Sequence, residues 1–181
     1  MYFKSGKEFC DYDFYLLTEM LEHLDVKVKT INNDISSSAD PDADGLFDKG
    51  EYYIGVGFSL IQRYISSTYP QSNIKKSDAL ELGKKIKSNL SYIKVINAGA
   101  NYWKHEDEWG LMNSITKDVN LLKGAAKNTI NTIELLTPWA SYTCSNLLAA
   151  LVGENEFVLS SLLPYIESWR FELDNKHGEI N

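Results

Sequence analysis

Residues 10–35 read CDYDFYLLTEMLEHLDVKVKTINNDI, and this stretch decides the fold class. Apolar side chains recur in it at alternating steps of four and three residues, which places them on one face of an α-helix. The residues of this stripe are Cys10, Phe14, Leu17, Leu21, Leu24, Val28, Ile31 and Ile35. Leu16 and Met20 make the stripe wider than the two-position seam of a coiled coil. The pattern therefore predicts one long helix of a bundle.

Similar apolar repeats predict five further helices. They are expected at 54–65, ending before Tyr69; at 78–103; at about 116–136, stopped by Pro138; at 142–152, ended by Gly153; and from near Asn155, with a kink or break at Pro164. Gly55 and Gly57 lie inside the second of these helices and are expected to let helices pack closely. No stretch shows the two-residue alternation of strands. Residues 1–181 are thus expected to form a single all-α domain, a bundle of about six helices.

Composition and charge limit the classes of function. The chain has 181 residues, of which 44% are hydrophobic and 24% charged, as expected for one globular domain. Lys and Arg total 18 and Asp and Glu total 25, so the formal charge is −7. This balance argues against general binding of nucleic acids or of anionic membranes. No apolar run approaches the roughly 20 residues of a membrane span.

The N-terminal residues and the cysteines indicate a cytoplasmic protein. The first residues carry acidic side chains and no continuous apolar segment of a signal peptide. Cys10 and Cys144 lack the spacing of a zinc site or of a redox motif. Both are therefore expected to be reduced thiols in the core.

The most specific chemical pattern is residues 40–51, Asp-Pro-Asp-Ala-Asp-Gly-Leu-Phe-Asp-Lys-Gly-Glu. Asp40, Asp42 and Asp44 alternate, so their carboxylates can converge on one point as the chain curls. Gly45 permits a sharp turn after them, and Glu51 can reach back from the following helix. Ca²⁺ takes six to eight oxygen ligands, and this spacing supplies them.

This loop resembles the calcium-binding loop of an EF-hand, and the resemblance covers the helix–loop–helix of residues 10–66. It implies a Ca²⁺ ion as cofactor. The ligands would be Asp40, Asp42, Asp44, the Leu46 carbonyl, Asp48 and Glu51. The competing interpretation is a solvated acidic turn without an ion.

EF-hands usually occur in pairs, and this sequence has one such loop. A single loop inside a bundle favours a structural or modulating ion over a sensor that opens a groove. The leading hypothesis is a calcium-stabilised interaction or scaffold protein with an unidentified protein partner. It assigns no catalytic residue.

A second cluster, of polar and aromatic residues, covers 97–109. Asn97, Asn101, His105 and Glu108 follow helical spacing and continue an apolar face. Such residues form either a site or a satisfied buried network, and a packing and capping network is favoured. As a site, His105 and Glu108 would make an acid–base pair.

Arg170 and His177 are separated by six residues, which resembles the Arg-x(4–6)-His pattern of HEPN-type ribonucleases. Proteins of that family are compact helical bundles, often of bacterial defence or toxin–antitoxin systems. The resemblance implies that Arg170 would bind the scissile phosphate and that His177 would act in acid–base cleavage, with His105 nearby. The alternative hypothesis is therefore a HEPN-like ribonuclease or a nuclease-inactive relative.

Overall fold

The computed structural model describes residues 2–5, 8–86, 89–109, 122–138 and 141–180, and it confirms the all-α bundle. The elements described are β1 (Tyr2–Ser5), β2 (Glu8–Asp11), α1 (Tyr12–Ser37), α2 (Leu46–Thr68), η1 (Tyr69–Ser72), α3 (Lys76–Leu80), α4 (Tyr92–His105), α5 (Gly124–Glu134), α6 (Thr143–Val152), η4 (Leu159–Leu162) and α7 (Leu163–Ile180). No helix in these ranges is both long and apolar enough to cross a membrane.

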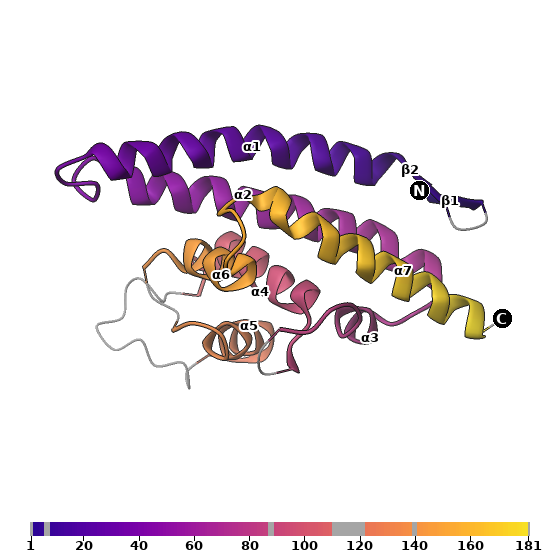
Figure 1. The fold of residues 1–181 in the computed structure, drawn as a ribbon. Coiled ribbons are helices and arrows are strands. Elements are labelled where there is room, and N and C mark those ends of the chain that lie inside the picture. The colour runs from indigo at the N-terminus through magenta and orange to yellow at the C-terminus, as the bar shows by residue number, and fades with distance from the viewer. Residues whose placement is uncertain (1, 6–7, 87–88, 110–121, 139–140, 181) are drawn as a thin grey trace.

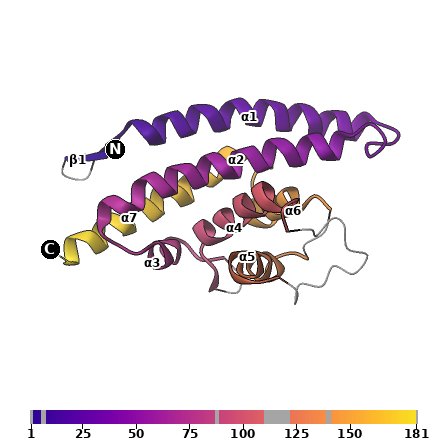
Figure 2. The same cartoon turned by 180° about the vertical axis from the view of Figure 1, so that it is seen from behind.

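The two longest helices organise the bundle. α1 and α2 run antiparallel and side by side, joined by the loop at one end of the molecule (Figures 1 and 2). α2 packs on its other side against α4 and α6, and α4 separates α2 from α5 (Figure 1). α2 is therefore the central element, as its continuous buried face from Ile54 to Thr68 requires.

Close packing around α2 depends on glycine. A Cβ atom at Gly55 would lie 2.1 Å from Trp103 Cδ1, and one at Gly99 would lie 2.7 Å from Phe58 Cδ2. Both distances are shorter than real contacts, so these positions let α2 and α4 approach. The expectation that Gly55 allows close packing is confirmed.

The N-terminus differs from the prediction of an all-helical chain. Residues 2–5 and 8–11 pair as a short antiparallel hairpin, so Cys10 lies in a strand rather than at the start of α1. Asp11 begins the helix instead, because its Oδ1 accepts a hydrogen bond from the Phe14 amide at 3.0 Å. Cys10 is exposed and only Cys144 is buried, so the core position expected for Cys10 is wrong.

The single helix expected over 78–103 is also wrong, because the chain forms α3 and then a separate α4. Gly83 adopts a φ of +83°, which right-handed helix cannot contain. Ser91 then starts α4 by accepting a hydrogen bond from the Lys94 amide at 3.0 Å. Local apolar spacing runs through both pieces, and it cannot reveal this break.

The C-terminal half follows the predicted pattern with shifted boundaries. α5 begins at Gly124, and residues 116–121 of the helix expected there lie outside the described part. α6 ends before Gly153 as predicted. The break at Pro164 is confirmed, because η4 precedes a separate α7. Pro164 is the second residue of α7, where a backbone N–H would have no acceptor within the helix, so its absence costs no hydrogen bond. The expected helix start near Asn155 is wrong.

Candidate functional site

The acidic loop between α1 and α2 is closed by its own hydrogen bonds. Asp40 Oδ1 accepts from the Ala43 amide at 3.1 Å, and Asp44 Oδ2 accepts from Ser38 Oγ at 2.6 Å. Gly45 turns the chain with a φ of +65°, as the pattern predicts. α2 then starts directly at Leu46, so the Leu46 carbonyl belongs to a helical first turn rather than to an open loop.

Glu51 points out of this loop toward α6. Its Oε1 accepts from the Cys144 amide at 2.6 Å, and its Oε2 accepts from the Ser145 amide and the Ser145 hydroxyl, each at 2.8 Å. The carboxylate therefore caps the N-terminus of α6, where unpaired amides and the helix dipole favour a negative charge. The expected bidentate calcium ligand has both oxygens engaged in this cap.

A second contact joins the loop to α6. The Tyr142 hydroxyl donates to Asp42 Oδ1 at 2.6 Å, and the Phe47 and Tyr142 rings lie 5.3 Å apart. The bond to Asp42 raises the pKa of Tyr142 to about 12. Asp48 is exposed. Within the described ranges, no three His, Cys, Asp or Glu side chains gather as a metal site, so this arrangement does not support calcium binding, which stays a prediction.

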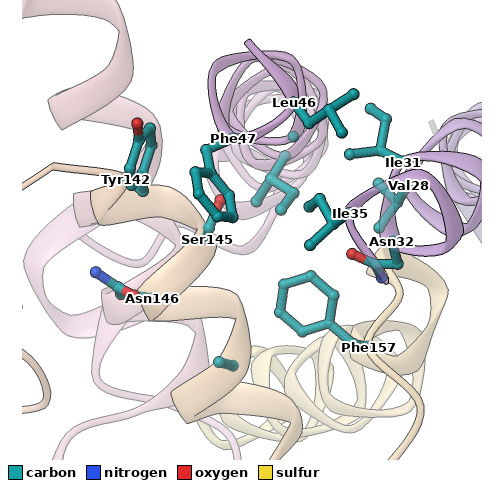
Figure 3. A pocket seen from close by; sticks show the side chains of 13 residues that line it. Val28, Ile31, Asn32, Ile35, Leu46, Phe47, Tyr142, Ser145, Asn146 and Phe157 are labelled. Carbon is teal, nitrogen blue, oxygen red and sulfur yellow. The ribbon is translucent and has the colours of Figure 1, made fainter. Parts of the chain in front are cut away.

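A mostly apolar cavity of about 310 Å³ lies beside this loop (Figure 3). Its wall comes from α1, α2, α6 and the segment before η4. The lining side chains belong to Val28, Ile31, Asn32, Ile35, Leu46, Phe47, Ile54, Tyr142, Ser145, Asn146, Ala149 and Phe157, with Gly50. The cavity thus uses two apolar residues of the predicted calcium loop, Leu46 and Phe47, and none of its predicted side-chain ligands.

Polar groups line this cavity from two walls, Asn32 from α1 and Ser145 and Asn146 from α6 (Figure 3). Asn146 is exposed, so the cavity reaches solvent on the α6 side. Tyr142, at the same edge, holds a left-handed φ of +61°, a conformation that bulky residues rarely adopt. Such strain is retained where the surroundings impose it, here the bond to Asp42.

Asp25 fixes the segment that carries Phe157. This carboxylate is only 5% exposed, and it accepts from the Leu159 amide at 2.7 Å and the Ser160 amide at 3.1 Å. It thereby caps η4 from the middle of α1. The apolar pattern did not predict this role, although Asp25 stands four residues after Leu21 and three before Val28, on the apolar face. An acid at such a position needs partners, and that signal was available.

The polar face of α4 is a network against α2. Gln62, only 7% exposed, donates from Nε2 to Asn97 Oδ1 at 3.0 Å and to Asn101 Oδ1 at 2.8 Å. Lys104 Nζ donates to Gln62 Oε1. Burial, and then the charge of Lys76, lower the pKa of Lys104. The favoured interpretation of this cluster, a packing network, describes the Gln62 side of it.

His105 and Glu108 are brought together as the sequence predicts. His105 Nδ1 and Glu108 Oε2 are 3.0 Å apart. The side chains are 42% and 69% exposed, and the imidazole stacks on Trp109 with ring centroids 6.2 Å apart. The pair therefore lies at the surface, at the C-terminal end of α4.

Arg170 occupies a buried cluster rather than a surface. Its Nη1 lies 2.9 Å from Asp11 Oδ2, and both side chains are 4% exposed. The Tyr64 hydroxyl donates to the same oxygen at 2.6 Å, and burial followed by that bond raises the pKa of Tyr64. The guanidinium also lies 4.8 Å from the centre of the Phe14 ring.

This burial does not support the role of phosphate ligand that the HEPN-like resemblance implies for Arg170. The His177 backbone is in α7, and its side chain lies outside the described part of the structure. The ribonuclease hypothesis therefore stays a prediction.

Comparisons with protein-family models, with curated proteins and with solved structures found no match for this chain.

Proposed function

We propose that this chain is a non-catalytic binding protein whose cavity beside the α1–α2 loop takes a small, uncharged, mostly apolar molecule. The observation that carries this proposal is the cavity of about 310 Å³. Its volume lies at the lower end of the range of about 300–1,000 Å³ usual for ligand pockets. Predominantly apolar walls with a few polar groups are typical of such sites.

The polar groups and charges near the cavity support the choice of ligand. Asn32 and Asn146 offer neutral donors and acceptors, which suit a hydroxyl or amide group. Acidic side chains outnumber the one basic residue of the loop, Lys49. Asp42 and Asp48 lie close enough to Tyr142 to affect its pKa, and Glu51 bonds Ser145. Their field disfavours a carboxylate ligand such as a fatty acid.

Titration with 1-octanol and octanoate, two probes of one chain length, tests this proposal. We expect saturable binding of octanol by calorimetry and at least tenfold weaker binding of octanoate. Ala149→Leu places a larger side chain in the cavity and should abolish octanol binding. Ala125→Leu makes the same change on the exposed part of α5 and should leave it unchanged.

Two results contradict the proposal. One is the absence of saturable octanol binding to a folded wild-type protein. The other is equal binding by the wild type and by a folded Ala149→Leu variant, because the ligand would then occupy another place.

Calcium binding by residues 40–51 is a separate proposal, made on the sequence pattern. It requires Glu51 to leave the N-terminus of α6, which engages both of its oxygens, whereas Asp42 bonds Tyr142 through Oδ1 only. Calorimetric titration with Ca²⁺ after treatment with a chelator tests it, and the same titration of Glu51→Gln shows whether Glu51 is a ligand.

A further inference from the structure

The outward side of the α4 network consists of hydrogen-bond donors. Lys104 is a donor only, so the Gln62 atom that faces it must be the oxygen Oε1. Gln62 Nε2 therefore faces the two asparagines, and each of them must present its oxygen to it. These donor and acceptor roles fix the orientation of all three amides.

The Nδ2 groups of Asn97 and Asn101 consequently face away from Gln62. In the ranges that the structure describes, neither Nδ2 donates to an acceptor, and neither is a buried atom without a partner. Neither Nδ2 is therefore fully buried, although Asn97 as a whole is only 9% exposed. Lys104 is exposed and donates to Gln62, which leaves two of its three N–H groups for another acceptor.

Lys104 brings a positive charge to these amides. Its Nζ bonds the same Gln62 side chain that bonds both asparagines, so the three residues lie close together. Glu108 follows the end of α4, and its Oε2 lies 3.0 Å from His105 Nδ1. One ammonium group and two amide donors thus meet around Gln62 on a chain of net charge −7.

We infer that Asn97, Asn101 and Lys104 form a binding site for an oxyanion, and specifically for a phosphoryl group. Such a group carries several acceptor oxygens and negative charge, and it satisfies all these donors at once. The overall acidity of the chain is screened over about 8 Å at physiological salt, so it does not prevent local binding.

Titration with inorganic phosphate, followed by calorimetry and phosphorus NMR, tests the site. We expect saturable binding by the wild type. Lys104→Gln should weaken it about tenfold, the effect of losing one charge-assisted hydrogen bond. Asn101→Asp should abolish binding, because it replaces a donor by a carboxylate while an oxygen still faces Gln62.

Two matched variants on the exposed face of α1 control for charge. Lys27→Gln and Asn33→Asp change the net charge by the same amounts far from α4, and phosphate binding should stay within twofold of the wild type. Thermal melting of each variant confirms that it is folded.

The source of the phosphoryl group is distinguished by two further probes, adenosine 5′-monophosphate and an oligoribonucleotide without a terminal phosphate. Binding of the first alone assigns the site to a phosphate monoester, and binding of the second assigns it to a phosphodiester backbone. The inference is overturned if none of the three probes binds the wild type, or if the control variants lose as much affinity as Lys104→Gln.

Discussion

Replacing Glu51 by Gln separates two roles for this residue, the cap of α6 and the last ligand of a calcium loop. The carboxylate accepts three hydrogen bonds, two from the amides of Cys144 and Ser145 and one from the Ser145 hydroxyl, at 2.6–2.8 Å. In Gln, one of the two acceptor oxygens becomes an NH₂ group that faces donors, and the charge at the helix N-terminus is lost.

The size of the effect follows from these contacts. Loss of a cap costs about 0.5–2 kcal/mol, and loss of the favourable dipole interaction adds about 0.3–1 kcal/mol. We therefore expect the variant to be less stable by about 1–3 kcal/mol. For a chain of this length, each kcal/mol lowers Tm by about 2–4 °C.

Urea unfolding followed by circular dichroism, with EGTA in the buffer, measures this difference. Glu22→Gln removes one charge from the exposed face of α1 and should change stability by less than about 0.5 kcal/mol. The cap argument is refuted if Glu51→Gln matches the wild type in EGTA. A loss of stability seen only when calcium is present would instead identify Glu51 as a metal ligand.

Three other predictions concern buried charge, helix packing and the cysteines. Arg170→Met should destabilise the fold by about 3–5 kcal/mol in a urea titration, because it leaves the buried Asp11 carboxylate without its ion pair, and an unchanged unfolding midpoint would contradict this. Gly50→Ala should stabilise α2 by about 0.5–1 kcal/mol, because the added Cβ meets only Ile31 Cγ2 at an ordinary 3.8 Å. Gly55→Ala should destabilise by about 1–3 kcal/mol through its clash with Trp103, so thermal melting that ranks the two variants the other way would refute the packing argument. With Ellman's reagent at pH 8, Cys10 should react at once and Cys144 only after unfolding, since burial raises the pKa of the Cys144 thiol, and immediate reaction of both would show that Cys144 is not buried.

The sequence located most helices because an apolar stripe is a local property. Residues three and four apart share a face of a helix wherever that helix packs. α1, α2 and α6 can therefore be predicted without knowing which helices they pack against. The same reasoning failed at residues 78–103, because Gly83 turns the chain without interrupting the apolar spacing. It also failed at the N-terminus, where a short hairpin carries too few residues to show alternation.

The candidate sites were harder to predict from the sequence than the helices. Residues 40–51 keep the spacing of a calcium loop, but spacing cannot show where a side chain finds its partner. His105 and Glu108 are three residues apart in the chain and meet as predicted. Gln62 bonds the amides of α4 from another helix, and the residues around it in the sequence gave no sign of this contact.

The sequence by itself determined an all-α bundle and the approximate places of its helices, because both follow from short-range periodicity. Only the tertiary structure decided the partners of the charged residues. Glu51 caps α6, Asp25 caps η4 and Arg170 pairs with Asp11 across 93, 134 and 159 residues of chain. A buried charge takes whichever donors the packing of distant helices brings within 3 Å, and no pattern along the chain encodes that distance.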